Sequence, residues 1–224
     1  MLEYEFSCVP LSLANANGQL HMANKSQLFP ILEGDDSVCT ALPPCEHPTC
    51  TIIDGMALLR AIGKPSDSRT FGDLAKAYIH AIKSYFNQYC DRVDVVFDRY
   101  LKYSIKCTAR QQRNKKNKGI LCRIHGINTK LPSNWNSFIS VNENKNEISK
   151  FLTKEILECD VGKGKEIIVS GGFQEDAQSS LDRNVTHLNS THEEADVRML
   201  LHAADANRTG YYRLIIRSPP ILMC

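Results

Sequence analysis

Four acidic side chains stand where this sequence could build a catalytic site. Asp54 and Asp98 each close a short apolar run that is typical of a buried parallel strand, and Glu194 and Asp196 open an amphipathic segment. Buried carboxylates without a paired base are costly, but a divalent cation neutralises them. Hard oxygen donors suit Mg²⁺ or Mn²⁺, and two such ions about 4 Å apart can support phosphodiester hydrolysis. We therefore predict that these four residues are metal ligands and catalytic residues.

A basic segment begins directly after Asp98 and indicates a polyanionic partner. Residues 99–130 contain ten basic side chains and no acidic one, which leaves 17 basic and 25 acidic residues, a net charge of −8, for the rest of the chain. Lys106, Arg110 and Arg113 are spaced i, i+4 and i+7, so they share one face if the segment is helical. We expect this face to bind nucleic-acid phosphates. The alternative is a solvated loop that serves solubility.

Each acidic residue also has a simpler interpretation. Asp54 could cap a turn, Asp98 could pair with Arg99, and the acids at 193–196 could merely favour the dipole at a helix start. Taken together with the basic face, the strand-end and helix-start acids favour the catalytic interpretation.

Alternating apolar and amphipathic segments predict an α/β fold that positions these residues. Strands are predicted at residues 51–54, 92–98, 165–170 and 211–216, helices at 71–90, 147–157 and 192–206 (with Thr191 as N-cap), and a loop at 174–191. Carboxyl ends of parallel strands meet at one sheet edge, so Asp54 and Asp98 should lie close together. We expect a three-layer α/β/α domain with a mainly parallel central sheet over residues 51–224. Residues 1–50 are interpreted as a strand-turn-helix extension and a Pro- and Cys-rich linker.

The composition excludes several protein classes. Of the 224 residues, 42% are hydrophobic and 23% charged, ordinary values for a globular chain, so wholesale disorder is excluded. No stretch approaches the roughly 18 apolar residues of a membrane span, so no membrane partner is expected. The start, MLEYEFSC, lacks the features of a signal peptide, and nine irregularly spaced cysteines are typical of reduced thiols. We therefore expect an intracellular protein, nuclear or cytoplasmic, of undetermined oligomeric state.

Three motifs resemble those of the PIN-like nuclease superfamily, in its flap-endonuclease branch. They are IIDGMALL at 52–59, VVFDRY at 95–100 and EEADVRMLL at 193–201. The resemblance implies that Asp54, Asp98, Glu194 and Asp196 are the metal ligands. It also implies that Lys106 and Arg113, seven residues apart, hold the scissile phosphate. VPLSLAN at 9–15 and THEEAD at 191–196 resemble an uncharacterised metazoan group of this superfamily, many of whose members derive from mobile elements.

The sequence departs from the family pattern at three points. Arg99 stands where the family has Gly, and Asp196 where Glu is usual. The family also has a strand that ends in an Asp-Thr-Asp motif, whereas here the strand region is followed by PILMC at 220–224. A one-base shift in suitable codons for ILMC reads Asp-Thr-Asp-Val, so a frame-shifted copy is one hypothesis, and a genuine end is the other. We expect a domain that is incomplete on its C-terminal side.

Two functions therefore follow from the sequence. The first is a metal-dependent nuclease-like domain that hydrolyses DNA or RNA with two Mg²⁺ or Mn²⁺ ions and is impaired in this chain. The alternative is a non-catalytic, nucleic-acid-binding remnant, so whether the chain is an enzyme stays open. A phosphatase and a dinucleotide enzyme are weaker alternatives, because Asp98 is followed by Arg and Tyr, and no GxGxxG follows either early strand.

Overall fold

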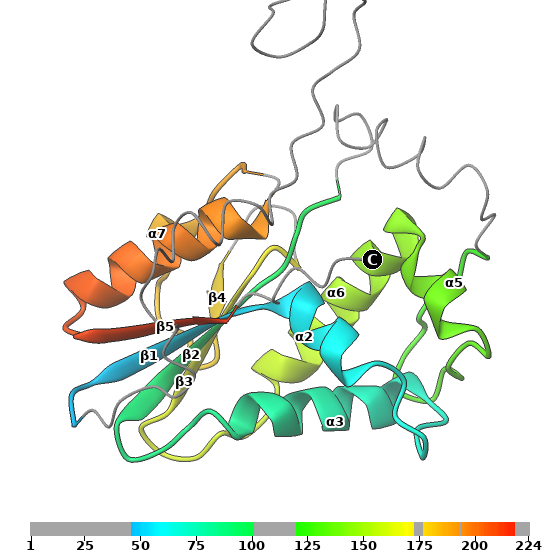
Figure 1. Cartoon of the computed structure of the whole chain (residues 1–224), viewed down its shortest axis with the longest axis horizontal. Coiled ribbons are helices and arrows are strands. Elements are labelled where there is room, and N and C mark those ends of the chain that lie inside the picture. Colours follow the sequence, from blue (N-terminus) through cyan, green and yellow to red (C-terminus); the bar gives the residue numbers. More distant parts are fainter. Residues whose placement is uncertain (1–45, 101–119, 173–176, 193, 218–224) are drawn as a thin grey trace, which may run out of the picture. The chain divides into compact units, whose positions relative to one another are not determined.

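Five strands form one sheet in the order β4-β3-β2-β1-β5 (Figure 1). A computed structural model describes residues 46–100, 120–172, 177–192 and 194–217. The strands are β1 (Thr49–Asp54), β2 (Cys90–Val96), β3 (Glu166–Ser170), β4 (Gln178–Ser179) and β5 (Arg213–Arg217). β1, β2, β3 and β5 are parallel, and only the short edge strand β4 is antiparallel to its neighbour. The carboxyl ends of β1, β2 and β3 therefore meet at one edge of the sheet.

One face of the sheet packs against four helices. They are α2 (Gly55–Ile62), α3 (Phe71–Lys83), α5 (Trp135–Ile139) and α6 (Asn142–Leu157). Alternate strand residues such as Ile53, Val95 and Val169 point to this face and form its core with the helices. The two-residue period of a strand explains why one apolar run can supply two cores, because the residues between these point the other way.

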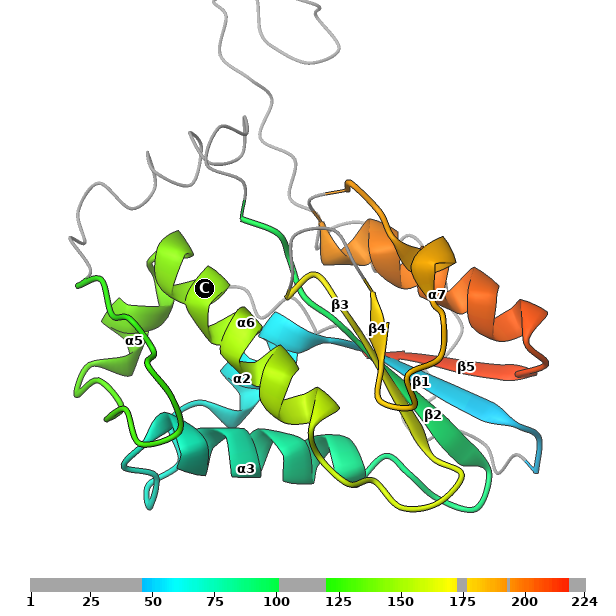
Figure 2. The same cartoon turned by 180° about the vertical axis from the view of Figure 1, so that it is seen from behind.

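The opposite face packs against α7 (Ala195–Arg208), which both views show on the other side of the sheet from α3 (Figures 1 and 2). Its apolar core is small: Cys50, Ile52 and Val96 of the strands meet Ala195, Met199 and Ala206 of the helix. Beside it, Ile168 packs on the segment that contains the 3-10 turn η2 (Thr186–Leu188). The described residues belong to one compact unit.

The start of α2 is fitted closely between the ends of β1 and β2. Gly55 follows Asp54, and a Cβ at this position would overlap the ring of the buried Phe97. The carbonyl of Gly55 also accepts a hydrogen bond from the buried Tyr78 hydroxyl at 2.8 Å. Glycine is needed here because the backbone of α2 passes directly beside the aromatic ring that precedes Asp98.

The α/β class and the mainly parallel sheet predicted from the sequence are confirmed, and the boundaries differ in physical detail. The predicted helix at 71–90 ends at Lys83, because the Asn87 side chain accepts from the amides of Tyr89 and Cys90 and turns the chain into β2. The predicted loop at 174–191 contains β4 and η2. The predictions for residues 1–45 and for the motif at 220–224 lie outside the described residues. None of the described helices has the length and apolar character to cross a membrane.

The predicted Thr191 N-cap is wrong. Helix α7 begins at Ala195 with Glu194 as its N-cap residue, and the Glu194 side chain makes no capping hydrogen bond. The first amide of the helix, that of Ala195, instead donates to Oδ1 of Asp98 at 2.9 Å. An acceptor from a distant strand end therefore takes the place of a local cap.

Candidate acidic site at the strand ends

Asp54 and Asp98 lie at the carboxyl ends of the neighbouring strands β1 and β2. Asp54 is the last residue of β1 and is paired in register with Val96, two residues before Asp98. Burial raises the pKa of Asp54; hydrogen bonds from the Ala57 and Met56 amides oppose this rise, and the negative charges of Asp98 and Asp196 add to it. Asp54 is therefore near enough to both other carboxylates to be repelled by them.

The simpler interpretation of Asp54 as a cap is also correct. Oδ1 of Asp54 accepts from the amides of Met56 at 2.9 Å and Ala57 at 3.0 Å and so caps helix α2. Both bonds use the same oxygen atom. A capping Asp fixes the orientation of its carboxylate, so capping and ligand binding are compatible roles for this side chain.

Asp98 is held by the start of α7 and not by Arg99. Its Oδ1 accepts from the Ala195 amide, and the Tyr100 hydroxyl lies 3.5 Å from Oδ2. Arg99 donates from Nη1 to the carbonyl of Ser190 at 2.9 Å, so the expected alternative of an Asp98–Arg99 pair is wrong. A carboxylate at a helix N-terminus interacts favourably with the helix dipole.

Glu194 and Asp196 come to this edge through the position of α7. Glu194 is the half-buried N-cap residue, and Asp196 lies exposed in the first turn. Through its charge, Asp196 contributes to the raised pKa of Asp54. The structure thus brings three of the four predicted acids into electrostatic contact, from β1, from the end of β2 and from α7.

These carboxylates do not form a finished chelating cluster. Within the part of the chain that the structure describes, no three or more His, Cys, Asp or Glu side chains are close enough together to hold a metal ion. The donor chemistry nevertheless fits a hard divalent cation, because Asp54, Asp98 and Asp196 supply carboxylate oxygens and the charges of the last two raise the pKa of Asp54. Glu193 and the acids at 175 and 176 lie outside the described residues.

The predicted phosphate-binding residues Lys106, Arg110 and Arg113 also lie outside the described residues. Two described arginines do lie beside the acids. Arg99 is half-buried, and the Arg198 side chain is buried on α7. Burial lowers the pKa of Arg198 to about 10, with the charge of Arg99 acting in the same direction and that of Asp98 against it. The acidic edge therefore has two cations, Arg99 and Arg198, beside it among the described residues.

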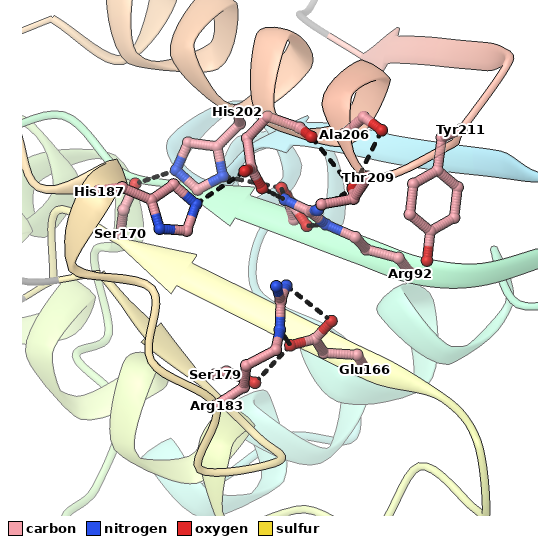
Figure 3. Close-up of polar contacts among 12 residues, drawn as sticks. Arg92, Glu166, Ser170, Ser179, Arg183, His187, His202, Ala206, Thr209 and Tyr211 are labelled. Atoms are coloured by element: carbon pink, nitrogen blue, oxygen red, sulfur yellow. Dashed lines mark hydrogen bonds and ion pairs between the residues drawn. The ribbon is translucent and has the colours of Figure 1, made fainter.

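Sequence reasoning missed a buried polar seam between β2 and α7. Arg92 donates from Nε and Nη2 to the two oxygens of Asp94 at 2.8 and 2.7 Å, and both side chains are within 1% of complete burial. Nδ1 of His202 lies 2.8 Å from Asp94 Oδ2. Nη2 of Arg92 also lies 2.9 Å from Asp205 Oδ2, an ion pair without hydrogen-bond geometry (Figure 3).

The seam reaches two further elements. Nε2 of His202 lies 3.0 Å from Oγ of Ser170, the last residue of β3. Nε2 of the partly exposed His187 lies 2.7 Å from Asp205 Oδ1. Burial acts to raise the pKa of Asp94, but the hydrogen bonds from His202 and Arg92 outweigh burial and hold it below its ordinary value. Two sequence signals for this seam were available. One is the pair Arg92 and Asp94 among the apolar residues of the predicted strand, and the other is the i, i+4, i+7 spacing of Arg198, His202 and Asp205.

A surface pocket lies beside α7 but does not contain the acids. Its lining comes from the outer face of α7 and the preceding segment, and includes His187, His192, Val197 and Leu200. None of the four predicted acidic residues lines this pocket. Comparisons of this chain with models of protein families, with curated proteins and with solved structures give no match.

Proposed function

We propose that the domain beginning at residue 51 is a PIN-like, flap-endonuclease-like nuclease domain that hydrolyses phosphodiester bonds in DNA or RNA with two Mg²⁺ or Mn²⁺ ions. The observation that carries the proposal is the position of Asp54 and Asp98 at the carboxyl ends of neighbouring parallel strands, where Asp98 accepts from the first amide of α7, that of the residue before Asp196. Carboxylates that gather at one sheet edge would be stabilised by a bound divalent cation.

In this proposal Asp54, Asp98, Glu194 and Asp196 hold the ions. When bound, such ions would supply activation of a water and stabilisation of the leaving oxygen of the phosphodiester. The protein's own contribution is orientation. The amides at the start of α2 fix the Asp54 carboxylate, and the Ala195 amide fixes that of Asp98. In the same proposal, Lys106, Arg110 and Arg113 would bind the nucleic-acid phosphates, with Lys106 and Arg113 on the scissile phosphate.

A second candidate is a non-catalytic domain that binds nucleic acid. One specific observation favours it, namely that Asp54 caps α2 and that Asp98 accepts from the first amide of α7. Such a domain needs the basic face of the chain but not the acids. Asp54 and Asp98 then serve only as caps for α2 and α7, which is the role their hydrogen bonds already give them.

A cleavage and binding assay separates the two candidates. The full chain is incubated with Mn²⁺ or Mg²⁺ and with labelled single-stranded, 5′-flap and duplex DNA and RNA, with and without EDTA. The matched variants are D54N, D98N and the control D67N, because Asp67 is exposed and lies outside the site. Asparagine keeps the capping oxygen and removes the charge.

The nuclease proposal requires EDTA-sensitive cleavage that falls at least about 100-fold in D54N and D98N but not in D67N, with unchanged affinity for substrate. Salt-dependent binding without cleavage in any of these proteins would support the binding domain. The absence of both cleavage and binding would reject both candidates. Metal titration by Mn²⁺ electron paramagnetic resonance adds a reading that does not depend on turnover: D54N and D98N should weaken Mn²⁺ binding, and D67N should not.

A further inference from the structure

We propose that the polar seam between α7 and β2 is a positioning device for the acidic site, and that Arg198 is its principal positioning residue. The seam sets where α7 begins along β2, and so places Ala195 and Asp196 beside Asp98. This inference rests on the proposed function for its catalytic consequence. Its structural content, that Arg198 fixes the start of α7 against Asp98, stands independently of that function.

Four successive contacts join the helix to the strand in matching order. Going along α7, residue 195 contacts residue 98, residue 198 contacts 97, residue 202 contacts 94, and residue 205 contacts 92. The four partners lie on β2 or directly after it. The helix spacings of three and four residues keep all four positions on one face. The helix therefore runs antiparallel to β2, and each contact corresponds to a single register of α7 on the strand.

Apolar packing alone does not fix this register. The apolar interface of α7 with the sheet is small, and two of its three helix members, Ala195 and Ala206, are alanines. Non-directional burial of small side chains changes little when a helix shifts by a turn, about 5.4 Å. The buried hydrogen bonds are directional, and such a shift would leave Arg198 and His202 without their partners and would remove the contact of His202 with Asp94.

Among the side-chain contacts of the seam, that of Arg198 lies closest to the acids. Its side chain is buried, and Nη2 donates to the carbonyl of Phe97, the residue before Asp98. Its Nε is buried without a hydrogen-bond partner, and within the described residues the guanidinium forms no ion pair. A buried cation with so few partners is unfavourable for folding alone, which indicates that its position serves the neighbouring site.

The strand ends are shaped to admit this guanidinium. Gly171 follows β3 with φ +91°, and a Cβ there would overlap both the Phe97 carbonyl oxygen and the Nη atoms of Arg198. Only glycine combines this backbone conformation with the open space. β2, β3 and α7 are thus fitted to one another around Arg198.

The deeper part of the seam is structural rather than nucleophilic. Asp94, His202 and Ser170 follow one another in the order of a Ser-His-Asp site, since Nδ1 of His202 lies 2.8 Å from Asp94 Oδ2 and Nε2 lies 3.0 Å from Ser170 Oγ. Ser170, however, is 3% exposed and His202 and Asp94 are fully buried, so no substrate reaches the hydroxyl. These groups anchor the middle of α7, and Arg198 aligns its start.

The experiment compares R198M, R198K and the control R208M on the same helix. Arg208 is exposed, and its Nε lies 3.4 Å from the Ala204 carbonyl within its own helix. The first reading is hydrogen exchange of the Ala195 amide by NMR, with the Tyr211 amide, which donates to the Ala206 carbonyl at 3.0 Å, as an internal reference. The second is Mn²⁺ affinity, and the third is the separate change of kcat and KM for cleavage.

We expect Ala195 exchange to accelerate at least tenfold in R198M, with Tyr211 exchange unchanged. We also expect about tenfold weaker Mn²⁺ binding and a lower kcat at unchanged KM, with intermediate values in R198K and none of these effects in R208M. A folded R198M or R198K with wild-type Ala195 exchange overturns the proposal. If R198M does not fold, R198K decides by the same criterion.

The readings also separate this inference from the proposed function. A wild-type chain that binds no Mn²⁺ and cleaves nothing rejects the nuclease, and the Ala195 exchange rate still decides whether Arg198 fixes the start of α7. Conversely, a cleaving enzyme whose kcat, Mn²⁺ affinity and Ala195 exchange all survive R198K retains the function and rejects the positioning role.

Discussion

Replacing Arg92 by methionine should cause one of the largest losses of stability available from a single substitution in the described structure. The side chain is 1% exposed, donates two hydrogen bonds to Asp94 and lies 2.9 Å from an oxygen of Asp205. Methionine fills a similar volume but leaves Asp94 buried with His202 as its one remaining partner among these contacts. Removing one member of a buried ion pair costs about 3–5 kcal/mol, because the other charge stays buried.

The same molecule contains a matched surface pair. Arg183 donates from Nε and Nη2 to the two oxygens of Glu166 at 3.0 and 3.1 Å, but the Arg183 side chain is 39% exposed (Figure 3). The contact geometry resembles that of Arg92 and Asp94, and burial is the main difference. Because the Glu166 side chain is 12% exposed and keeps a hydrogen bond from the Ser179 hydroxyl at 2.6 Å, R183M should cost at most about 1 kcal/mol.

Urea denaturation of wild type, R92M and R183M at pH 7 measures both losses in the free energy of unfolding. In thermal melts, a domain of this size shifts its Tm by about 2–4 °C per kcal/mol, so R92M should melt roughly 6–20 °C lower and R183M less than about 4 °C lower. The m-value should stay constant if the folded state is preserved.

The pH dependence of this difference tests the assigned cause. The folded-state pKa of Asp94 lies below its ordinary 3.8, so its interactions stabilise the fold above that pH and are lost as pH falls through the folded-state pKa. In R92M the pKa of Asp94 should be raised, and protonation then neutralises the stranded charge. The gap between wild type and R92M should therefore narrow as pH falls below about 5. A cost under about 1 kcal/mol, an equal cost for R183M, or a gap independent of pH would refute the reasoning.

Three further outcomes are expected. In EDTA, D54N should be more stable than wild type at pH 7, because the folded-state pKa of Asp54 is raised and its ionised form is therefore unfavourable in the folded state. This advantage should vanish as pH falls and Asp54 in the wild type protonates. Thermal melts from pH 4 to 8 measure the difference. G171A should destabilise the fold by about 1–3 kcal/mol, measured in urea, because its Cβ meets the Phe97 carbonyl and Arg198 at a positive φ. If Lys106, Arg110 and Arg113 bind phosphates, replacing each by Gln should reduce the slope of log affinity against log salt by roughly one in fluorescence anisotropy titrations.

The sheet and its acidic edge could be predicted because their signals are local. The apolar runs that end at Asp54 and Asp98 define β1 and β2, and the two acids do lie at neighbouring strand ends. Helix α2 was not predicted, although Asp54 is its cap, since the eight residues 55–62 are a short segment directly joined to a strand. The true start of α7 could not be read locally, because its first amide is satisfied by Asp98, 97 residues away.

The polar seam was missed for a related reason. Arg92 and Asp94 occupy positions in β2 that alternate with the apolar residues facing α3 and α6, so a strand pattern tolerates them without showing where they are satisfied. Their partners on α7 are more than 100 residues distant. The rule that a buried charge needs a partner predicts that Arg92 and Asp94 are paired, but it does not identify the partners on α7.

The seam gives the acidic edge a property that local capping would not. A helix that begins at its own N-cap can move as a unit without disturbing that cap, whereas the first amide of α7 is satisfied only while Asp98 stays in place. Displacing α7 therefore breaks the cap, the Arg198 contact and the repulsive arrangement of Asp54, Asp98 and Asp196 together. Because the contacts along β2 hold α7 in one register, the same register keeps the negative charges of Asp98 and Asp196 near Asp54 at the start of the helix, although like charges repel one another. The buried contacts in the middle of the seam thus offset the repulsion between the carboxylates at its exposed end.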